Sequence, residues 1–270
     1  DINAKQWILL ETQSIPSTIF GLPDPPVPVP LSARSQIFAI VSTEFQGIVD
    51  LYLSGSDGNF YSLTAWYPGI IKYWGKIKTN GVFTPLPKAT FQVCANHLFT
   101  LDNQSRLWVG ELKPDSFNYA PSWVQLTSDS IKVNSFVIAQ KGTLITLLVN
   151  IDAGEIHAAS FVSADQPIAW ERVGIAVNFL ALPHAKITWA IPREGHLDVF
   201  TTGQDGKIYT TYWEAQLGWE GNHNWSPLEP NSQTFTISPQ ANLLALNRIK
   251  NQLEILTQAV DQTIWRTWWT

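Results

Sequence analysis

The sequence has few of the residues that form disulfides, charged surfaces or membrane spans. Its 270 residues include one cysteine and no methionine, and only 14% of them are charged. A single cysteine cannot form an intramolecular disulfide, and no apolar run approaches the 18 or more residues of a membrane span. The net charge is −5 and lysine and arginine form no cluster, whereas nucleic-acid binders present a basic face. We therefore expect neither nucleic-acid binding nor membrane insertion.

Motifs for catalysis and metal binding are also missing. The sequence contains no phosphate-cradling glycine-rich loop, nucleophile elbow or zinc-type Cys/His spacing, so we expect no cofactor and no metal. Cys94 lies in a predicted inner strand, which favours a buried, inert thiol. A chain that starts at Asp1 without methionine suggests a removed leader. On this basis we expect a secreted or extracellular protein.

What the sequence does contain is a repeat. Its clearest copy reads GHLDVFTTGQDGKIY at residues 195–209, followed by WSPL at 225–228. A close relative reads GIVDLYLSGSDGNFY at 47–61, followed by WGKI at 74–77. Three weaker copies share an anchor residue and, in two of them, a later Trp-x-x-Leu-like segment. The fifth copy ends before that segment, and WILL at residues 7–10 supplies it from the other end of the chain.

The spacing and the internal pattern of the copies predict propeller blades. The anchors are separated by 47, 49, 52 and 56 residues, and repeats of about 40–50 residues with several strands are typical of propellers. Each good copy alternates apolar and polar residues, turns at Asp-Gly and continues into a strand of β-branched and aromatic residues. The anchors are Tyr61, Trp108, His157, Tyr209 and Trp265.

An apolar inner strand precedes each copy, which gives four strands per blade. The inner strands are predicted at 38–41, 91–94, 136–139, 188–191 and 243–246. We predict an all-β, single-domain protein over residues 1–270, a five-bladed β-propeller closed by an N-terminal strand at about 4–11. Closure removes the exposed strand edges of the terminal blade. The predicted blades span about 36–78, 89–127, 134–174, 186–229, and 241–270 together with 4–11.

A proline-rich insertion at about 14–35 breaks the pattern. It contains GLPDPPVPVP at residues 21–30, which favours polyproline II and cannot enter a sheet interior. Two interpretations stay open. The segment is either a stiff surface excursion or a docking site for a partner or a second subunit.

Carboxylates at one repeat position raise the possibility of catalysis. Asp50, Asp198 and Glu254 lie eleven residues before their anchors, where the other copies have His97 and Thr146. Carboxylates that converge in a ring could serve glycoside hydrolysis, which requires two of them. The simpler interpretation is a polar strand residue that recurs because the repeat recurs, and we therefore do not expect an enzyme.

Aromatic residues offer a second kind of site. Sugars present an apolar C–H face and a rim of hydroxyls, which suits flat aromatic rings beside polar groups. The Trp of Trp-x-x-Leu is expected mainly to pack between blades, whereas Trp66, Tyr67, Trp213 and Trp219 are expected to reach solvent. The candidate ligand-binding residues are Trp213, Trp219, Tyr212, Asn224, Trp66, Tyr67, Trp74 and Trp225.

The copies at 195–228 and 47–77 resemble the repeats of PLL-type propeller lectins, and the count of five blades is similar to the tachylectin and tectonin group. The resemblance implies binding of fucose, galactose or N-acetylated amino sugars in pockets between blades. We therefore predict a multivalent lectin without catalysis, which binds glycans on cell surfaces and could form a homo-oligomer. The alternatives are a five-bladed glycoside hydrolase and a protein-binding propeller.

Overall fold

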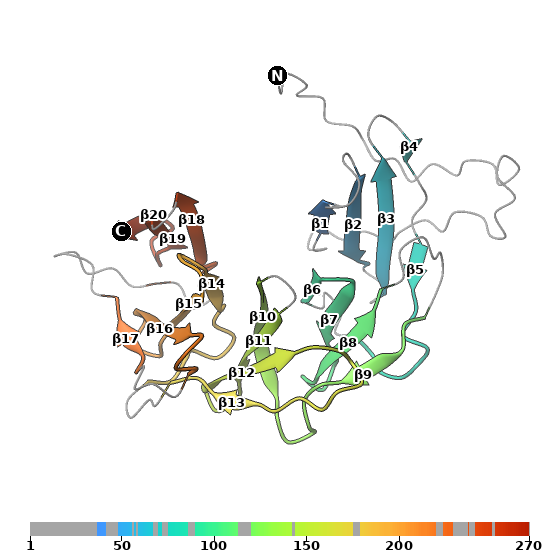
Figure 1. Cartoon of the computed structure of the whole chain (residues 1–270), viewed down its shortest axis with the longest axis horizontal. Helices are drawn as coiled ribbons and strands as arrows, with labels where there is room; N and C mark the ends of the chain where they lie inside the picture. Colours follow the sequence, from blue (N-terminus) through green and yellow to red (C-terminus); the bar gives the residue numbers. More distant parts are fainter. Residues whose placement is uncertain are drawn as a thin grey trace, which may run out of the picture. The chain divides into compact units, whose positions relative to one another are not determined.

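The computed structural model describes an all-β chain (Figure 1). It covers residues 37–41, 48–55, 57, 59–66, 70–71, 75–85, 90–112, 120–141, 144–174, 179–219, 224–228, 237, 241–249 and 252–269. All regular secondary structure within these residues is β-strand. None of the described residues forms a helix long and apolar enough to cross a membrane. The chain divides into two compact units, 1–103 with 110–123 and 104–109 with 124–270. Each unit is described by itself below.

The first unit contains the first sheet and part of the second. The first sheet runs in the order β1 (Ile37–Val41), β2 (Ile48–Ser54), β3 (Phe60–Trp66), and both β4 (Ile70–Ile71) and β5 (Gly75–Ile77) pair with β3. The second sheet has the order β6 (Phe91–Cys94), β7 (His97–Leu101), β8 (Leu107–Glu111), β9 (Trp123–Gln125). Its strands β8 and β9 contribute residues to both units.

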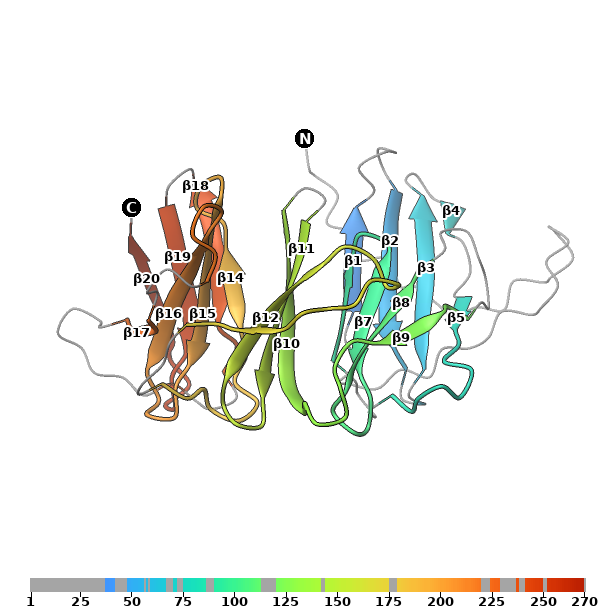
Figure 2. The same cartoon turned by 60° about the horizontal axis from the view of Figure 1, so that its bottom comes forward.

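The second unit contains three further sheets, each following the chain in sequential order (Figure 2). The third sheet consists of β10 (Val133–Lys141), β11 (Leu144–Ile151), β12 (Ile156–Phe161) and β13 (Glu171–Arg172). The fourth consists of β14 (Thr188–Ala190), β15 (His196–Thr202), β16 (Ile208–Glu214) and β17 (Ser226–Pro227). The fifth has three strands, β18 (Leu244–Ile249), β19 (Gln252–Gln258) and β20 (Ile264–Trp269).

The Asp-Gly turns of the repeat are held by the side chains around them. In the fourth sheet, Asp205 Oδ1 accepts a hydrogen bond from the Lys207 amide at 3.1 Å, and Asp205 Oδ2 accepts one from Tyr209 Oη at 2.9 Å. The Tyr209 ring lies so close to Gly203 that a Cβ there would come within 2.6 Å of it. The spacing from Gly to Asp to Tyr, which recurs in the two clearest copies of the repeat, is therefore explained by hairpin geometry.

Other anchors make the same kind of contact with their hairpins. Tyr61 Oη donates to Asp57 Oδ2 at 2.8 Å in the first sheet, and burial raises the pKa of the Tyr61 phenol. In the third sheet His157 Nε2 lies 3.1 Å from Glu155 Oε2, and in the fifth Trp265 Nε1 donates to Thr263 Oγ1 at 2.8 Å. The anchor residue thus closes the turn between the two middle strands.

The Trp of Trp-x-x-Leu joins one sheet to the sheet before it. Trp123 Nε1 donates to the Lys78 carbonyl at 3.0 Å within the first unit. Within the second unit, Trp170 Nε1 donates to the Leu126 carbonyl at 3.0 Å and Trp225 Nε1 to the Val173 carbonyl at 2.9 Å. Each acceptor lies at the end of the preceding outer strand or just after it. The expected packing role of this tryptophan is confirmed for these three residues.

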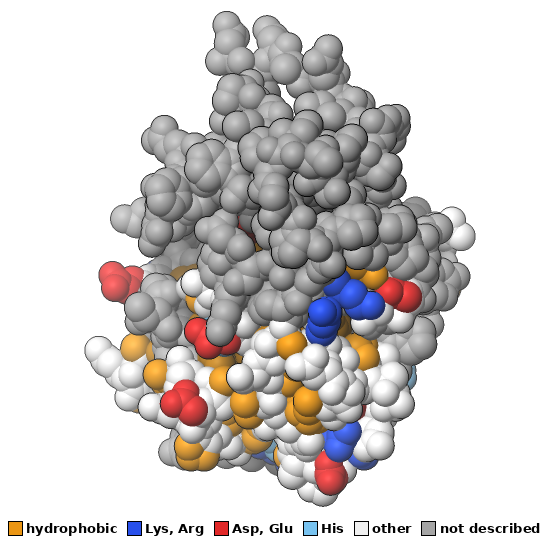
Figure 3. Space-filling view, turned by 90° about the vertical axis from the view of Figure 1, so that its right-hand side faces the viewer, with side chains coloured by type: hydrophobic (Ala, Val, Ile, Leu, Met, Phe, Trp, Pro, Cys, Tyr) orange, Lys and Arg blue, Asp and Glu red, His pale blue; other side chains and the backbone are white. Residues whose placement is uncertain are grey.

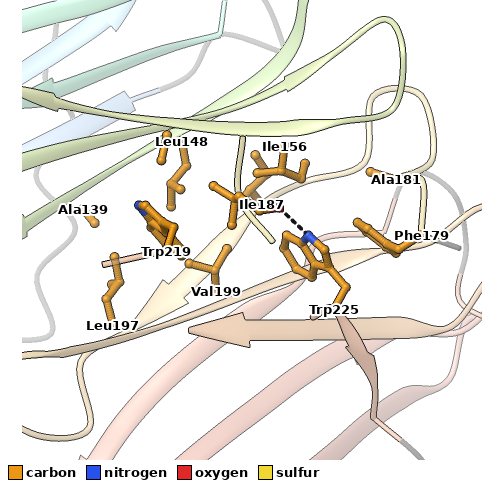
Figure 4. Packing of buried hydrophobic residues seen from close by; sticks show 12 residues of the cluster. Ala139, Leu148, Ile156, Phe179, Ala181, Ile187, Leu197, Val199, Trp219 and Trp225 are labelled. Carbon is orange, nitrogen blue, oxygen red and sulfur yellow. Dashed lines mark hydrogen bonds between the residues drawn. The ribbon is translucent and has the colours of Figure 1, made fainter. Parts of the chain in front are cut away.

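Two apolar clusters fill the spaces between the sheets of the second unit. The cluster between the third and fourth sheets is drawn in Figure 4, where Trp225 lies beside Phe179. The two rings stack with centroids 4.6 Å apart. The second cluster joins the fourth sheet to the fifth; its members are Ala190, Phe200, Ile208, Ile237, Ala241, Leu243, Ala245, Leu253 and Ile255.

These observations confirm the all-β prediction and place strands at all five predicted inner-strand positions. Cys94 lies on β6 and is buried, and burial raises the pKa of its thiol to about 11. The predicted closing strand at about 4–11 and the proline-rich insertion at about 14–35 lie outside the described residues.

Candidate functional site

The predicted site residues fall into three groups. Trp66 ends β3, but its side chain, together with Tyr67 and Trp74, lies outside the described residues. Asn224 is exposed just before β17. The four remaining aromatic residues belong to the fourth sheet or the loop after it, and they differ in environment; they are Tyr212, Trp213, Trp219 and Trp225.

Trp219 and Trp225 are core residues. Trp219 was expected at the surface but is only 4% exposed, and like Trp225 it belongs to the cluster of Figure 4. The turn after β16 makes this possible, because the Gly218 amide donates to the Glu214 carbonyl at 2.7 Å and Gly218 has φ +63°. That left-handed conformation suits glycine. The chain therefore folds back at once and directs Trp219 inward.

Tyr212 and Trp213 lie on opposite faces of the fourth sheet, because neighbouring residues of a strand alternate in direction. Trp213 is half-buried against the cluster between the third and fourth sheets. Tyr212 lies opposite Asp198, and Glu214 lies opposite His196, in the register of β15 with β16. These four side chains therefore share the face that is turned toward the fifth sheet.

On that face the polar side chains form a connected cluster, which we call the fourth-sheet cluster: Arg193, His196, Asp198, Tyr212 and Glu214. His196 Nε2 lies 3.0 Å from Asp198 Oδ1, and His196 Nδ1 lies 3.3 Å from Glu214 Oε1. Arg193 Nη2 donates to the same Glu214 oxygen at 2.8 Å. The His196 ring stacks on Tyr212 with centroids 4.9 Å apart and planes inclined by 22°.

The two carboxyls of the cluster have pKa values shifted in opposite directions. Burial raises the pKa of Asp198, against the opposing effect of His196 and Arg193. The hydrogen bond from His196, aided by Arg193, lowers the pKa of Glu214. The cluster thus combines one partly desolvated acid, one half-buried acid, two basic groups and a half-buried aromatic ring.

The fifth sheet carries a related arrangement at the same repeat position. Glu254 lies opposite Trp268, as Asp198 lies opposite Tyr212. Arg266 Nη2 donates to the buried Glu254 Oε1 at 2.7 Å, and the Arg266 guanidinium lies 5.2 Å from the centre of a Trp268 ring. Trp268 is 58% exposed. We call Glu254, Arg266 and Trp268 the fifth-sheet trio.

An acid opposite an aromatic residue therefore occurs in the same register in two consecutive sheets. The acid precedes the anchor by eleven residues and the aromatic follows it by three. The equivalent residues are Asp50 with Thr64, His97 with Glu111, and Thr146 with Ser160 in the first, second and third sheets. None of these three has the acid–aromatic combination.

Arg266 and Trp268 were not among the predicted site residues. A usable signal was present, because Arg266 and Trp268 are two residues apart on β20 and so share one face, and Trp268 lies opposite Glu254. Arg193 was missed for another reason. It lies in the loop before β15, outside the repeated pattern.

The geometry gives little support to catalysis by the predicted carboxylates. Asp198 and Glu254 each contact a basic side chain of their own sheet, His196 and Arg266. Asp50 belongs to the other unit. In the part of the chain that the structure describes, no group of three or more His, Cys, Asp or Glu side chains could hold a metal ion. On the face drawn in Figure 3, basic and acidic side chains are interspersed with neutral ones.

Comparisons with known proteins decide the fold. No protein-family model and no curated protein matches the sequence. The BP39L lectin from Burkholderia pseudomallei matches the structure with a TM-score of 0.66 at 16% identity, over 87% of this chain and 66% of the lectin. The lectin of Aleuria aurantia, described as a six-bladed β-propeller with a novel fucose recognition mode, matches with a TM-score of 0.56 at 14% identity, over 90% and 79%. This chain has a β-propeller fold.

AofleA from Arthrobotrys oligospora is a further neighbour, with a TM-score of 0.55 at 12% identity, over 88% of this chain and 70% of its own. The propeller part of the predicted resemblance is therefore confirmed. The more specific resemblance to PLL-type or tachylectin-like proteins stays a prediction. This chain spans about two thirds of the BP39L lectin.

Proposed function

We propose that this protein is a carbohydrate-binding lectin without catalytic activity. The observation that carries the proposal is the acid–aromatic pair, Asp198 with Tyr212 and Glu254 with Trp268, which recurs in the same register beside a basic side chain. The fourth-sheet cluster and the fifth-sheet trio are the two candidate sites. The missing pairs in the other three sheets indicate that those positions do not serve as sites of this kind.

The chemistry of the pair suits a sugar. A carboxylate accepts hydrogen bonds from two neighbouring hydroxyls, and a guanidinium donates to hydroxyl or ring oxygens. An exposed indole such as Trp268 offers a flat apolar surface for the C–H face of the sugar. A single exposed ring beside one acid–base pair suits a monosaccharide or the end of an oligosaccharide.

Fucose is the first sugar to test. Neighbouring structures include a fucose-specific lectin from Aleuria aurantia and SapL1 in complex with α-methyl fucoside, with TM-scores of 0.52 and 0.55. Galactose and N-acetylated amino sugars follow from the resemblance of the repeats. Two sites on one rigid domain raise avidity for surfaces dense in glycans, and we propose that the protein acts on such surfaces outside the cell.

A glycan array tests the proposed lectin activity. The purified chain should bind a glycan subset, and α-methyl fucoside, α-methyl galactoside or N-acetylglucosamine should inhibit that binding. Trp268→Ala should weaken binding by about tenfold or more, as expected when an aromatic platform worth about 1.4 kcal/mol is removed. Trp213→Ala is the comparison variant on the opposite face of the fourth sheet. If the wild type binds no glycan of the array, or if Trp268→Ala binds as well as the wild type, the proposed function at this site is contradicted.

A further inference from the structure

The aromatic ring of the fourth-sheet cluster already carries a stacking partner. The His196 imidazole lies on Tyr212 with a centroid separation of 4.9 Å and an interplanar angle of 22°. This is the position relative to the ring that the apolar face of a sugar takes on an aromatic platform. Tyr212 itself is half-buried. A sugar that stacks on this face of Tyr212 must first displace His196.

Contacts with both acids hold His196 in place. Its Nε2 lies 3.0 Å from Asp198 Oδ1 and its Nδ1 lies 3.3 Å from Glu214 Oε1. Arg193 donates to the same Glu214 oxygen at 2.8 Å. One oxygen of each carboxylate, Asp198 Oδ1 and Glu214 Oε1, is thus already engaged by the side chains of the cluster. The His196 side chain is only 11% exposed, which agrees with a fixed position.

The fifth sheet lacks this histidine. Gln252 occupies the equivalent place, two residues before Glu254 as His196 is two residues before Asp198. The ring opposite the acid is Trp268, which is 58% exposed while it contacts Arg266. The two candidate sites therefore share an acid–aromatic pair but differ in how much of the aromatic surface a ligand can reach.

We propose that His196 is a specificity-determining residue that closes the fourth-sheet cluster to simple monosaccharides. The fifth-sheet trio is then the site that binds them. The inference rests on the proposed lectin function and assigns different roles to its two sites. Displacement of a side chain held by charge-assisted hydrogen bonds weakens binding at the fourth sheet by about ten- to a hundred-fold.

An NMR titration with α-methyl fucoside separates the two sites, because the backbone amides of β16 and β20 report on them independently. In the wild-type protein the sugar should change the amide chemical shifts of β20. At the same sugar concentration the amide chemical shifts of β16 should stay unchanged. In His196→Gln, which gives the fourth sheet the residue type of the fifth, amides of both strands should shift. Tyr212→Ala in the His196→Gln background should abolish the new shifts in β16.

His157→Gln is the matched control. His157 also contacts a glutamate that pairs with an arginine, Glu155 with Arg172, but it lies in the third sheet outside both sites. This variant should behave as the wild type. His196→Asn repeats the test with a smaller side chain if His196→Gln loses its dispersed amide spectrum.

Two results overturn the inference while leaving the lectin function intact. One is a wild-type protein in which β16 and β20 shift together. The other is a folded His196 variant in which β20 shifts and β16 does not. A wild-type protein whose β20 amides do not respond to α-methyl fucoside, galactoside or N-acetylglucosamine contradicts the proposed function itself.

Discussion

The fourth and fifth sheets carry the same cross-strand pair on faces that are covered to different extents. On the fourth sheet, Ala190 and Ile208 are 3% and 6% exposed, because the fifth sheet packs against them. The equivalent residues of the fifth sheet, Leu246 and Ile264, are 40% and 76% exposed. The same repeat position is thus core in one sheet and surface in the next.

This difference separates what the repeat requires for folding from what is available for binding. In the fourth sheet the neighbouring aromatic residues are used for packing, and the acids contact His196 and Arg193. In the fifth sheet an equivalent acid pairs with Arg266, and the indole of Trp268 stays largely exposed. A repeat position therefore has a defined backbone geometry, whereas the exposure of its side chain differs from sheet to sheet.

Removal of one tryptophan from each sheet should give the largest difference between the two sheets in the free energy of unfolding. Trp225→Ala should lower the free energy of unfolding by about 3–5 kcal/mol, because it removes a buried ring and its hydrogen bond to Val173. Trp268→Ala should cost less than about 1 kcal/mol, as is usual for exposed positions. Urea unfolding followed by circular dichroism measures both. Equal costs would mean that the Trp268 face is packed in solution.

A charge placed at the equivalent inner-strand positions tests the two faces directly. Ala190→Asp should destabilise the protein by about 3 kcal/mol or more, because it buries a carboxylate without a partner. Leu246→Asp should cost less, about 0.5–1 kcal/mol, because the position is partly exposed, although Glu254 on the opposite strand repels the new charge. Thermal and urea unfolding of the two variants give the comparison. A large cost at Leu246 indicates that another sheet covers this face, as in a closed ring.

Much of the fold was predictable because the repeat combines two local signals. Alternating apolar residues define the strands, and the Asp-Gly turn fixes the hairpin between β15 and β16. The packing role of Trp225 was also predictable, because the same tryptophan recurs at the end of several copies. These features depend on residues close in sequence or on contacts repeated from sheet to sheet.

The candidate sites were less predictable because they depend on departures from the repeat. Trp219 was expected at the surface, yet the tight turn at Gly218 directs it into the core. Arg193 reaches Glu214 from the loop before β15, 21 residues away along the chain. Trp268 can contact a ligand only because its indole is exposed. That exposure is set by what packs against the fifth sheet, and the local sequence does not reveal it.

Loss of a hairpin hydrogen bond should also destabilise the fourth sheet more than the fifth, but the difference in the free energy of unfolding should be smaller. Tyr209→Phe removes the hydrogen bond to Asp205 and should lower the free energy of unfolding by about 0.5–1.5 kcal/mol. In the fifth sheet Thr263→Val removes the contact of Thr263 with the Trp265 indole and with Asp261, all exposed. That variant should cost less than about 0.5 kcal/mol. A larger loss for Thr263→Val than for Tyr209→Phe in urea unfolding contradicts this ranking.

The smallest expected difference concerns pH and the acid of the fourth-sheet pair. Because burial raises the folded-state pKa of Asp198 above its value in the unfolded chain, the native state holds this proton over a range where the unfolded state has lost it. Asp198 therefore favours folding most below the ordinary aspartate pKa of about 3.9, and that contribution is lost as pH rises through the higher folded value. Asp198→Asn cannot titrate, so the stability of this variant relative to the wild type should increase with pH over that window. Urea unfolding of both proteins at a series of acidic pH values measures the difference. A difference that decreases with pH would mean that the contacts with His196 and Arg193, and not burial, dominate the behaviour of Asp198.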